Sequence, residues 1–240
     1  MVDFVTLWKA QHLTAKHYGE RAWWATHGPE YIEKLACGIG RNMLEPWTLH
    51  VLTDTPDRVP ALPYVGVQKL LDTGAGWWAK VQAFRPDLGL GPRAIYFDLD
   101  TVVVGALAPL VALTPPEKGA IMANDHAIPQ LPNGSIMRYD GARAGWLWNT
   151  YAANPHEIER RFSVWPHASD QAYVADSLRT LGLMQPFIQD TLGEKSLLNL
   201  HSQISKGVQA DETTIALIGR NTFKPHTMLK YDVVADNWRC

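Results

Sequence analysis

The chain has 240 residues, of which 46% are hydrophobic, so it can bury a full core as one domain covering residues 1–240. Its 22 basic and 24 acidic residues give a net charge of −2, so no sequence-wide field favours nucleic acids or acidic membranes as partners. The longest apolar stretch, residues 102–113, contains Gly105 and Pro109 and is too short to cross a bilayer. We therefore expect a soluble protein without a membrane span.

The first half of the chain alternates strand and helix patterns. Residues 2–7 predict a strand, and residues 29–43 predict a helix because apolar side chains recur every four positions. Residues 47–52 alternate as a second strand, and a short helix over residues 78–84 precedes a third strand over residues 94–97. This order predicts an α/β fold with a mixed, mostly parallel sheet that is flanked by helices and binds ligands at the carboxyl ends of its strands.

The second half continues with further strands and helices. Strands are predicted over residues 119–123, 135–139, 197–200 and 214–218, and helices over residues 143–153 and 169–181. Ser169 is the expected N-cap of the last helix, with Asp170 in its first turn. No internal repeat or flexible linker interrupts the pattern, which favours a single domain.

The two cysteines are Cys37, within a helical pattern, and Cys240, at the last position. They are too few for a disulfide framework. The first residues, which include Asp3 and Lys9, lack an apolar stretch long enough for a secretion signal. Both features favour a reducing, cytoplasmic setting, in a bacterial or a virus-infected cell.

Asp98 and Asp100 form a D-x-D sequence where the predicted strand over residues 94–97 ends. Two carboxylates at such a place suit a hard divalent cation, Mn²⁺ or Mg²⁺. A cation held by only two carboxylates keeps open positions for a phosphate-bearing substrate. The alternative is that both residues only cap a strand end.

Lys80 and the pair Asp170–Gln171 are further candidates. Lys80 would act as a point charge beside a diphosphate, or would be an ordinary exposed helix residue. Asp170 and Gln171 would present a carboxylate and an amide to a sugar, although an acidic first turn is also ordinary helix-dipole chemistry. Residues 219–226 combine a turn with cationic side chains, and they form either a phosphate cradle or a plain loop.

Residues 96–101 also resemble the first motif of haloacid dehalogenase-like phosphatases, in which the first Asp is the nucleophile and the second the general acid. That motif ordinarily lies near the chain start and is followed by Gly-Thr. Here nearly a hundred residues precede it, and the late acidic pair Asp232 and Asp236 is poor support for the family's metal-binding motif. A phosphatase is therefore a minor alternative.

Taken in chain order, these motifs resemble family 8 glycosyltransferases of the GT-A fold, the glycogenin and galactosyltransferase type, over most of the chain. The resemblance implies a nucleotide-sugar donor, usually a UDP-sugar. It also implies a divalent metal, Mn²⁺ or Mg²⁺, on Asp98 and Asp100, and a transfer to an acceptor hydroxyl with retained configuration. Asp98 would contact both the metal and the donor.

The resemblance also assigns roles to single residues around the diphosphate and the sugar. Lys80 matches the family's lysine near the diphosphate. Asn133 and Ser135 match the family's turn beside the donor sugar. Asp170 and Gln171 match its D-Q pair beside the anomeric carbon, which makes them the candidate catalytic residues.

At the ends of the chain the match is less complete. Thr6 and Leu7 end the strand at which the family holds the base, and Gly219 and Lys224 match its late phosphate loop. The family places a histidine, the third protein ligand of the metal, where this chain has Ile218. We therefore expect the metal to bind weakly without the donor, and we expect a histidine introduced at residue 218 to restore a nitrogen ligand.

Two alternatives concern activity and acceptor. The missing histidine leaves open an inactive homologue that holds a nucleotide sugar or a glycan without turning it over. For an active enzyme, the acceptor is a saccharide, a glycoconjugate or a modified DNA base, and the sequence does not choose among them.

Overall fold

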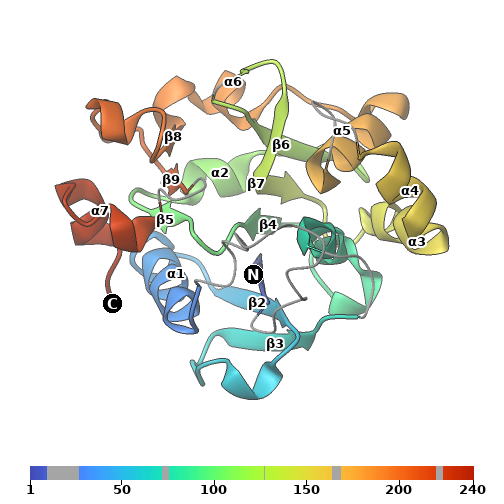
Figure 1. Cartoon of the computed structure of the whole chain (residues 1–240), viewed down its shortest axis with the longest axis horizontal. Helices are drawn as coiled ribbons and strands as arrows, with labels where there is room; N and C mark the ends of the chain where they lie inside the picture. The colour runs from blue at the N-terminus through green and yellow to red at the C-terminus, as the bar shows by residue number, and fades with distance from the viewer. Residues whose placement is uncertain (10–26, 72–75, 127, 164–168, 220–223) are drawn as a thin grey trace.

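A six-stranded sheet lies at the centre of the described structure, a computed structural model that covers residues 1–9, 27–71, 76–126, 128–163, 169–219 and 224–240. The strand order is β3-β2-β1-β4-β7-β6 (Figure 1). These strands are β1 (Val2–Trp8), β2 (Trp47–Thr53), β3 (Val65–Lys69), β4 (Ala94–Phe97), β6 (Ala120–Asn124) and β7 (Pro132–Tyr139). The first four are parallel, and β7 runs antiparallel to β4 and β6. The predicted mixed, mostly parallel sheet is confirmed.

The strands are apolar on both sides because helices cover both faces of the sheet. In β1, Phe4 packs into the core on one face and Val5 into the core on the other. In β4, Ile95 and Phe97 lie on the side of Phe4, whereas Tyr96 lies on the side of Val5. This alternation continues to the end of β4 and sends Tyr96 toward the helix that carries Lys80.

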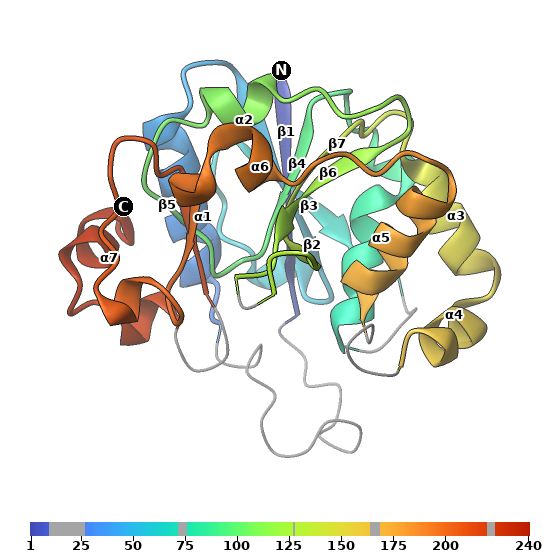
Figure 2. The same cartoon turned by 90° about the horizontal axis from the view of Figure 1, so that it is seen from above.

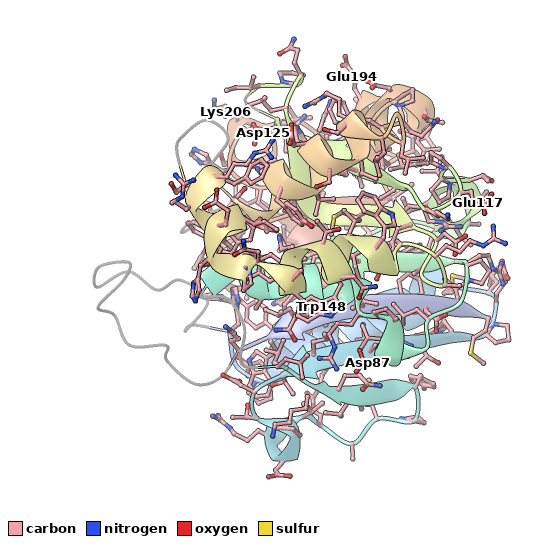
Figure 3. All side chains as sticks on the ribbon, turned by 90° about the vertical axis from the view of Figure 1, so that its right-hand side faces the viewer. Asp87, Glu117, Asp125, Trp148, Glu194 and Lys206 are labelled. Carbon is pink, nitrogen blue, oxygen red and sulfur yellow. A yellow bond between two sulfur atoms is a disulfide. The ribbon has the colours of Figure 1, made fainter. Side chains whose placement is uncertain are left out.

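Different elements cover the two faces (Figure 2). One face carries α1 (Glu30–Asn42), α2 (Ala108–Ala112), α6 (Ile188–Leu192), α7 (Asp232–Asn237) and a small sheet of β5 (Val102–Val103), β9 (Ala216–Ile218) and β8 (Leu197–Asn199). The other carries the 3₁₀ helix η4 (Gly76–Phe84), α3 (Gly145–Ala153) and α5 (Asp170–Thr180), with α4 (Pro155–Arg161) following α3. Figure 3 views this second layer, where Trp148 of α3 is 8% exposed.

Several elements were not predicted from the sequence. The edge strand β3 is only partly buried, and α2, α4, α6 and α7 each have seven residues or fewer, too short for a clear helical period. Short 3₁₀ turns at Pro56–Arg58, Pro86–Leu88, Glu194–Ser196, Ile204–Lys206 and Pro225–Thr227 complete the described elements. None of the helices in the described ranges is both long and apolar enough to cross a membrane.

Cys37 and Cys240 form a disulfide, with their Cα atoms 5.3 Å apart and a sequence separation of 203. The sequence analysis did not predict this bond, because only the fold brings α1 beside the C-terminus (Figure 1). Arg41 of α1 strengthens the same contact by donating a 2.7 Å hydrogen bond to the Asn237 carbonyl. Because disulfides are rare in cytosolic proteins, the bond gives no support to the predicted reducing setting.

We expect Cys37→Ser to lower the free energy of unfolding by about 2–4 kcal/mol, because the bond restricts a long loop of the unfolded chain. Urea unfolding of the oxidised protein and of the variant measures the difference. Cys240→Ser is the matched control and should be equally unstable. Dithiothreitol should bring the oxidised protein to the same level and leave both variants unchanged. Equal stability of the oxidised protein and Cys37→Ser would mean that the cysteines are not bonded in solution.

Candidate active site

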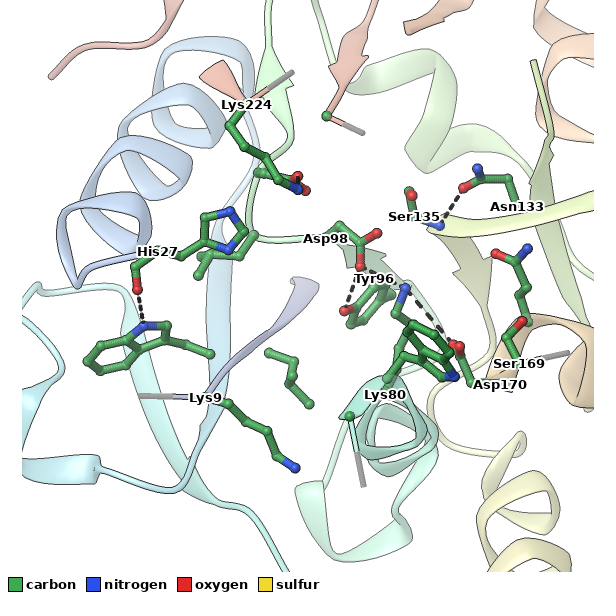
Figure 4. Close-up of a pocket in the computed structure, with 18 of the residues that line it drawn as sticks. Lys9, His27, Lys80, Tyr96, Asp98, Asn133, Ser135, Ser169, Asp170 and Lys224 are labelled. Atoms are coloured by element: carbon green, nitrogen blue, oxygen red, sulfur yellow. Dashed lines mark hydrogen bonds and ion pairs between the residues drawn. The ribbon is translucent and has the colours of Figure 1, made fainter. Parts of the chain in front are cut away.

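A cavity of about 410 Å³ opens where β1 and β4 end and β7 begins (Figure 4). Its size is typical of a small-molecule site. Because β7 is antiparallel, its first residues lie at the same edge of the sheet as the last residues of β4, and Phe97 pairs with Ile136. The cavity is lined by Leu7, Trp8, Lys9, His27, Gly76, Trp77, Lys80, Tyr96, Asp98, Leu99, Asp100, Asp125, Asn133, Ser135, Ser169, Asp170, Gln171, Asn199, Gly219 and Lys224.

The D-x-D residues sit in a turn directly after β4. The Thr101 amide donates to the Asp98 carbonyl at 3.0 Å, and the Asp98 amide donates to the Ser135 carbonyl at 2.7 Å. These bonds fix the backbone between β4 and β7. The side chain of Asp98 turns toward η4, and that of Asp100 turns toward the C-terminal segment, so both carboxylates line one cavity from different directions.

Asp98 is held by a lysine and a tyrosine. Its Oδ1 lies 2.8 Å from Nζ of Lys80 and accepts a 3.0 Å hydrogen bond from the Tyr96 hydroxyl. The ammonium group lies 5.3 Å from the centre of the Tyr96 ring. Burial alone would lower the pKa of Lys80, but the charges of Asp98 and Asp170 outweigh it and raise that pKa above its ordinary value. Lys80 is therefore a fixed cation.

Asp100 is paired with the second lysine of the cavity. Nζ of Lys224 contacts Oδ2 of Asp100 at 2.5 Å, and both side chains are about nine-tenths buried. Burial would raise the pKa of Asp100, but the Lys224 charge prevails and holds it below its ordinary value. Gly219 is required beside this pair, because a Cβ at that position would lie 2.8 Å from Cγ of Asp100. Residues 220–223 of the predicted loop lie outside the described residues.

The start of α5 faces the start of β7 across the cavity. Oε1 of Gln171 accepts a 3.1 Å hydrogen bond from the Gly134 amide, and the Gly134 carbonyl accepts one of 3.3 Å from Lys80. Oδ1 of Asn133 accepts a 2.8 Å hydrogen bond from the Ser135 amide. Ser169 precedes the helix, as expected of the N-cap position, but its side chain makes no capping hydrogen bond.

Asp170 is a buried carboxyl group of the cavity whose pKa is raised. Burial raises its pKa to about 6 from an ordinary value of 3.8, and the Lys80 ammonium, 3.9 Å away, only partly opposes this. The nearby charge of Asp98 adds to the increase. Asp170 therefore takes up a proton near neutral pH, which is common for groups in functional sites.

This pKa predicts a pH dependence of stability. The folded protein binds the Asp170 proton more tightly than the unfolded chain, so its contribution to the free energy of unfolding falls as pH rises from about 4 to about 6. The decrease should be about 3 kcal/mol, at 1.36 kcal/mol per pKa unit. Urea unfolding at pH 4 and pH 7 should show a lower free energy of unfolding at pH 7 for wild type, and Asp170→Asn should lack this decrease. The surface variant Asp176→Asn should behave like wild type, and parallel pH profiles of wild type and Asp170→Asn would contradict the assignment.

The cavity offers a partial set of metal ligands. Asp98 and Asp100 supply the carboxylates that Mn²⁺ or Mg²⁺ prefers, although each now faces a lysine. Across the described ranges, no three His, Cys, Asp or Glu side chains are close enough together to hold an ion by themselves. His27 lines the same cavity, and its buried Nε2 has no hydrogen-bond partner. Asp98 and Asp100 could therefore supply two oxygen ligands, and a divalent cation there would depend on a substrate for the rest of its shell.

The structure places nearly all predicted site residues around this cavity: Leu7, Lys80, Asp98, Asp100, Asn133, Ser135, Asp170, Gln171, Gly219 and Lys224 line it. Thr6 does not, because it is fully buried within β1. Ile218 is 1% exposed and packs in the core on the α1 face, so the expectation that a histidine there would reach the metal is not supported. An imidazole at that position would instead be buried among apolar side chains.

Sequence reasoning missed several lining residues. His27, Trp77 and Asp125 are single polar or aromatic side chains without a motif around them. Trp8 is the last residue of β1 and Lys9 follows it, and a strand prediction extended by one residue would have included Trp8. Asp232 and Asp236, the late pair of the phosphatase interpretation, are exposed on α7 and do not line the cavity.

The chain matches no protein-family model and no curated protein sequence. It is similar to solved structures of glycosyltransferases. The galactosyltransferase LgtC, in complex with donor and acceptor sugar analogues, has 10% identity and a TM-score of 0.64 over 99% of this chain and 95% of that one. GlyE of Streptococcus pneumoniae TIGR4 has 11% identity and a TM-score of 0.62, over 98% and 63%. The bifunctional glycosyltransferase WbbM has 13% identity and a TM-score of 0.57, over 99% and 49%. At such low identity the likeness shows the fold, and it confirms that the chain has the GT-A fold of family 8-like glycosyltransferases.

Proposed function

We propose that the protein is a retaining glycosyltransferase that moves a sugar from a nucleotide-sugar donor, a UDP-sugar, to an acceptor hydroxyl. The observation that carries this proposal is the joint position of Lys80 and Lys224 in one cavity, each paired with a carboxylate of the D-x-D sequence. Such an arrangement binds a diphosphate and stabilises the negative charge that builds on it as the sugar departs. The GT-A fold favours this proposal over a phosphatase.

The charge of the cavity supports a role for a divalent cation. Four carboxylates outnumber three lysines among the lining residues, namely Asp98, Asp100, Asp125 and Asp170 against Lys9, Lys80 and Lys224. A donor diphosphate adds further negative charge to this set. Mn²⁺ or Mg²⁺ held by Asp98 and Asp100 would supply the missing positive charge to the diphosphate when the donor is bound. Lys80 and Lys224 would hold the phosphate oxygens from opposite sides.

We assign the other residues of the cavity to two parts of the donor, its base and its sugar. Leu7, one residue before the end of β1, lines the cavity and would lie beside the base. Asn133, Ser135, Asp170 and Gln171 all line the cavity. In this proposal the first two would lie beside the donor sugar and the last two next to its reacting carbon. The hydrogen bond from the Gly134 amide to Oε1 of Gln171 holds the Gln171 side chain in a fixed position. A saccharide acceptor is favoured over a DNA base because LgtC was solved with an acceptor sugar analogue.

A panel of nucleotide sugars tests the proposal. One UDP-sugar should raise the melting temperature in the presence of Mn²⁺ and should slowly release UDP, and NMR of a transfer product should show retained anomeric configuration. Lys206→Met, an exposed substitution outside the cavity, is the control and should behave like wild type. Binding without release of UDP or transfer would identify an inactive homologue, and a panel in which no nucleotide sugar binds would overturn the proposal.

A further inference from the structure

A second cavity, of about 590 Å³, lies at the edge of the central sheet opposite the candidate active site. Two of its lining residues mark this position, since Arg93 precedes the first residue of β4 and Asp140 follows the last residue of β7. The active-site cavity opens at the other ends of these two strands. The apolar residues that line the second cavity are Pro92, Ala108, Val111, Ala112, Leu113 and Pro115.

Arg138 of β7 lines the second cavity, although it is only 4% exposed. Its Nη1 donates hydrogen bonds to the carbonyls of Pro92 at 3.1 Å and Tyr139 at 2.6 Å. Its Nε donates one to the carbonyl of Val111 at 3.4 Å. Within the part of the chain that the structure describes, Nη2 makes no hydrogen bond. Three carbonyl oxygens therefore hold the guanidinium group in place and leave one of its nitrogens without an acceptor.

The positive charge of Arg138 also lacks a counter-charge, because no carboxylate of the described residues forms an ion pair with it. The two acidic residues of the cavity have other partners: Glu45 contacts Arg93 at 2.6 Å, and Asp140 lies 4.0 Å from Nε of Arg143. Carbonyl oxygens carry no net charge, and a buried charge is costly unless it is paired. Burial accordingly lowers the pKa of Arg138 to about 10, although the Asp140 charge opposes this.

We propose that the second cavity binds a small molecule that carries a carboxylate on an apolar body. The carboxylate accepts a hydrogen bond from Nη2 of Arg138 and supplies the counter-charge that the described residues lack. A singly charged group fits better than a phosphate monoester, because Glu45 and Asp140 line the same cavity and repel a second negative charge. The apolar body lies against α2 and the residues after it. The site is independent of the proposed sugar transfer, since the two cavities share no lining residue.

Benzoate, a carboxylate on an apolar ring, is a suitable probe, and benzamide is its uncharged counterpart of similar shape. NMR of the arginine Nε–Hε groups should show one signal that shifts with benzoate and not with benzamide, and Arg138→Met should lack that signal. The same variant should bind benzoate about tenfold more weakly, as expected when a hydrogen bond between charged groups is lost. Arg179→Met removes an exposed guanidinium of α5 outside the cavity and should bind benzoate as wild type does.

Two variants at Ala112 test the position of the carboxylate without removing Arg138. Ala112 is an exposed residue of α2 that lines the cavity, so its substitution should leave the fold intact. Ala112→Glu should weaken benzoate binding roughly fivefold, and Ala112→Lys should tighten it by a similar factor, which is the size expected of charge pairs near the surface. These two variants decide the question even if Arg138→Met does not fold.

Three results would overturn the proposal. They are an Arg138 signal that benzoate leaves unchanged, equal affinity for benzoate and benzamide, and benzoate affinity that neither charge at residue 112 alters. Tighter binding of the doubly charged phenyl phosphate than of benzoate would contradict a carboxylate as the bound group.

Discussion

Replacing Asp100 with asparagine should stop sugar transfer and also destabilise the fold. The substitution keeps the side-chain volume but leaves the Lys224 ammonium buried against a neutral amide. Removing one partner of a buried ion pair costs about 3–5 kcal/mol. Urea unfolding should show this loss, and the transfer rate of the folded fraction should fall below detection because a carboxylate of the diphosphate site is gone.

A double variant separates these two effects. Asp100→Leu combined with Lys224→Met removes both charges, and replacing a whole buried pair by apolar groups of similar volume is often neutral for stability. The double variant should therefore unfold nearly as wild type does, yet remain without transfer activity. Wild-type stability of Asp100→Asn alone would show that Lys224 and Asp100 are not paired in solution. Transfer by the double variant would exclude both residues from the diphosphate site.

The sheet was predictable because its strands carry local signals. Residues 2–7, 47–52 and 94–97 are short apolar runs bounded by turns, and each was recognised within one residue of its observed end. Their order along the chain, with a helix between the first two, predicted the parallel arrangement. The D-x-D residues followed from the same reasoning, since ligands gather where parallel strands end.

The contacts that complete the site were not predictable, because they join segments far apart in the chain. The pair of Lys224 with Asp100 spans 124 residues, and the disulfide spans 203. His27 has no neighbouring motif, and only the packing of the segment before α1 brings it to the cavity. A sequence pattern shows which residues are suited to a site but not which distant partner each of them meets.

Side-chain direction was the other source of error. Thr6 is fully buried within β1, whereas the next residue, Leu7, reaches the cavity. Ile218 and Gly219 differ in the same way at the end of β9, where Gly219 lies against Asp100 and Ile218 in the core. A match to a family motif shows where along the chain a site lies. It does not show which of two adjacent side chains points toward the ligand, because a shift of one residue reverses that direction.

Lys80→Met should have the second large effect, because Lys80 is the shared partner of Asp98 and of the buried Asp170. Its ammonium lies 2.8 Å from Asp98 and 3.9 Å from Asp170, and it also bonds the Gly134 carbonyl. Without this charge the pKa of Asp170 should rise further above 6, since Lys80 is the main group that lowers it. The variant should therefore lose stability at pH 7 and recover part of it as pH falls and Asp170 takes up a proton.

Donor binding should weaken in the same variant in a way that identifies the contact. A cation beside phosphates acts through charge, so affinity for UDP should fall by about 1.5–3 kcal/mol, as for hydrogen bonds to charged groups. Affinity for uridine, which lacks the diphosphate, should change little. Isothermal titration of both ligands at pH 6, where the variant is better folded, measures the two losses. Lys80→Arg keeps the charge and should retain most of the affinity for UDP, with a loss only from its bulkier, planar head. If Lys80→Met weakened the binding of uridine and of UDP equally, Lys80 would not contact the diphosphate. Its role would then be to shape the cavity by holding Asp98 and Asp170 together.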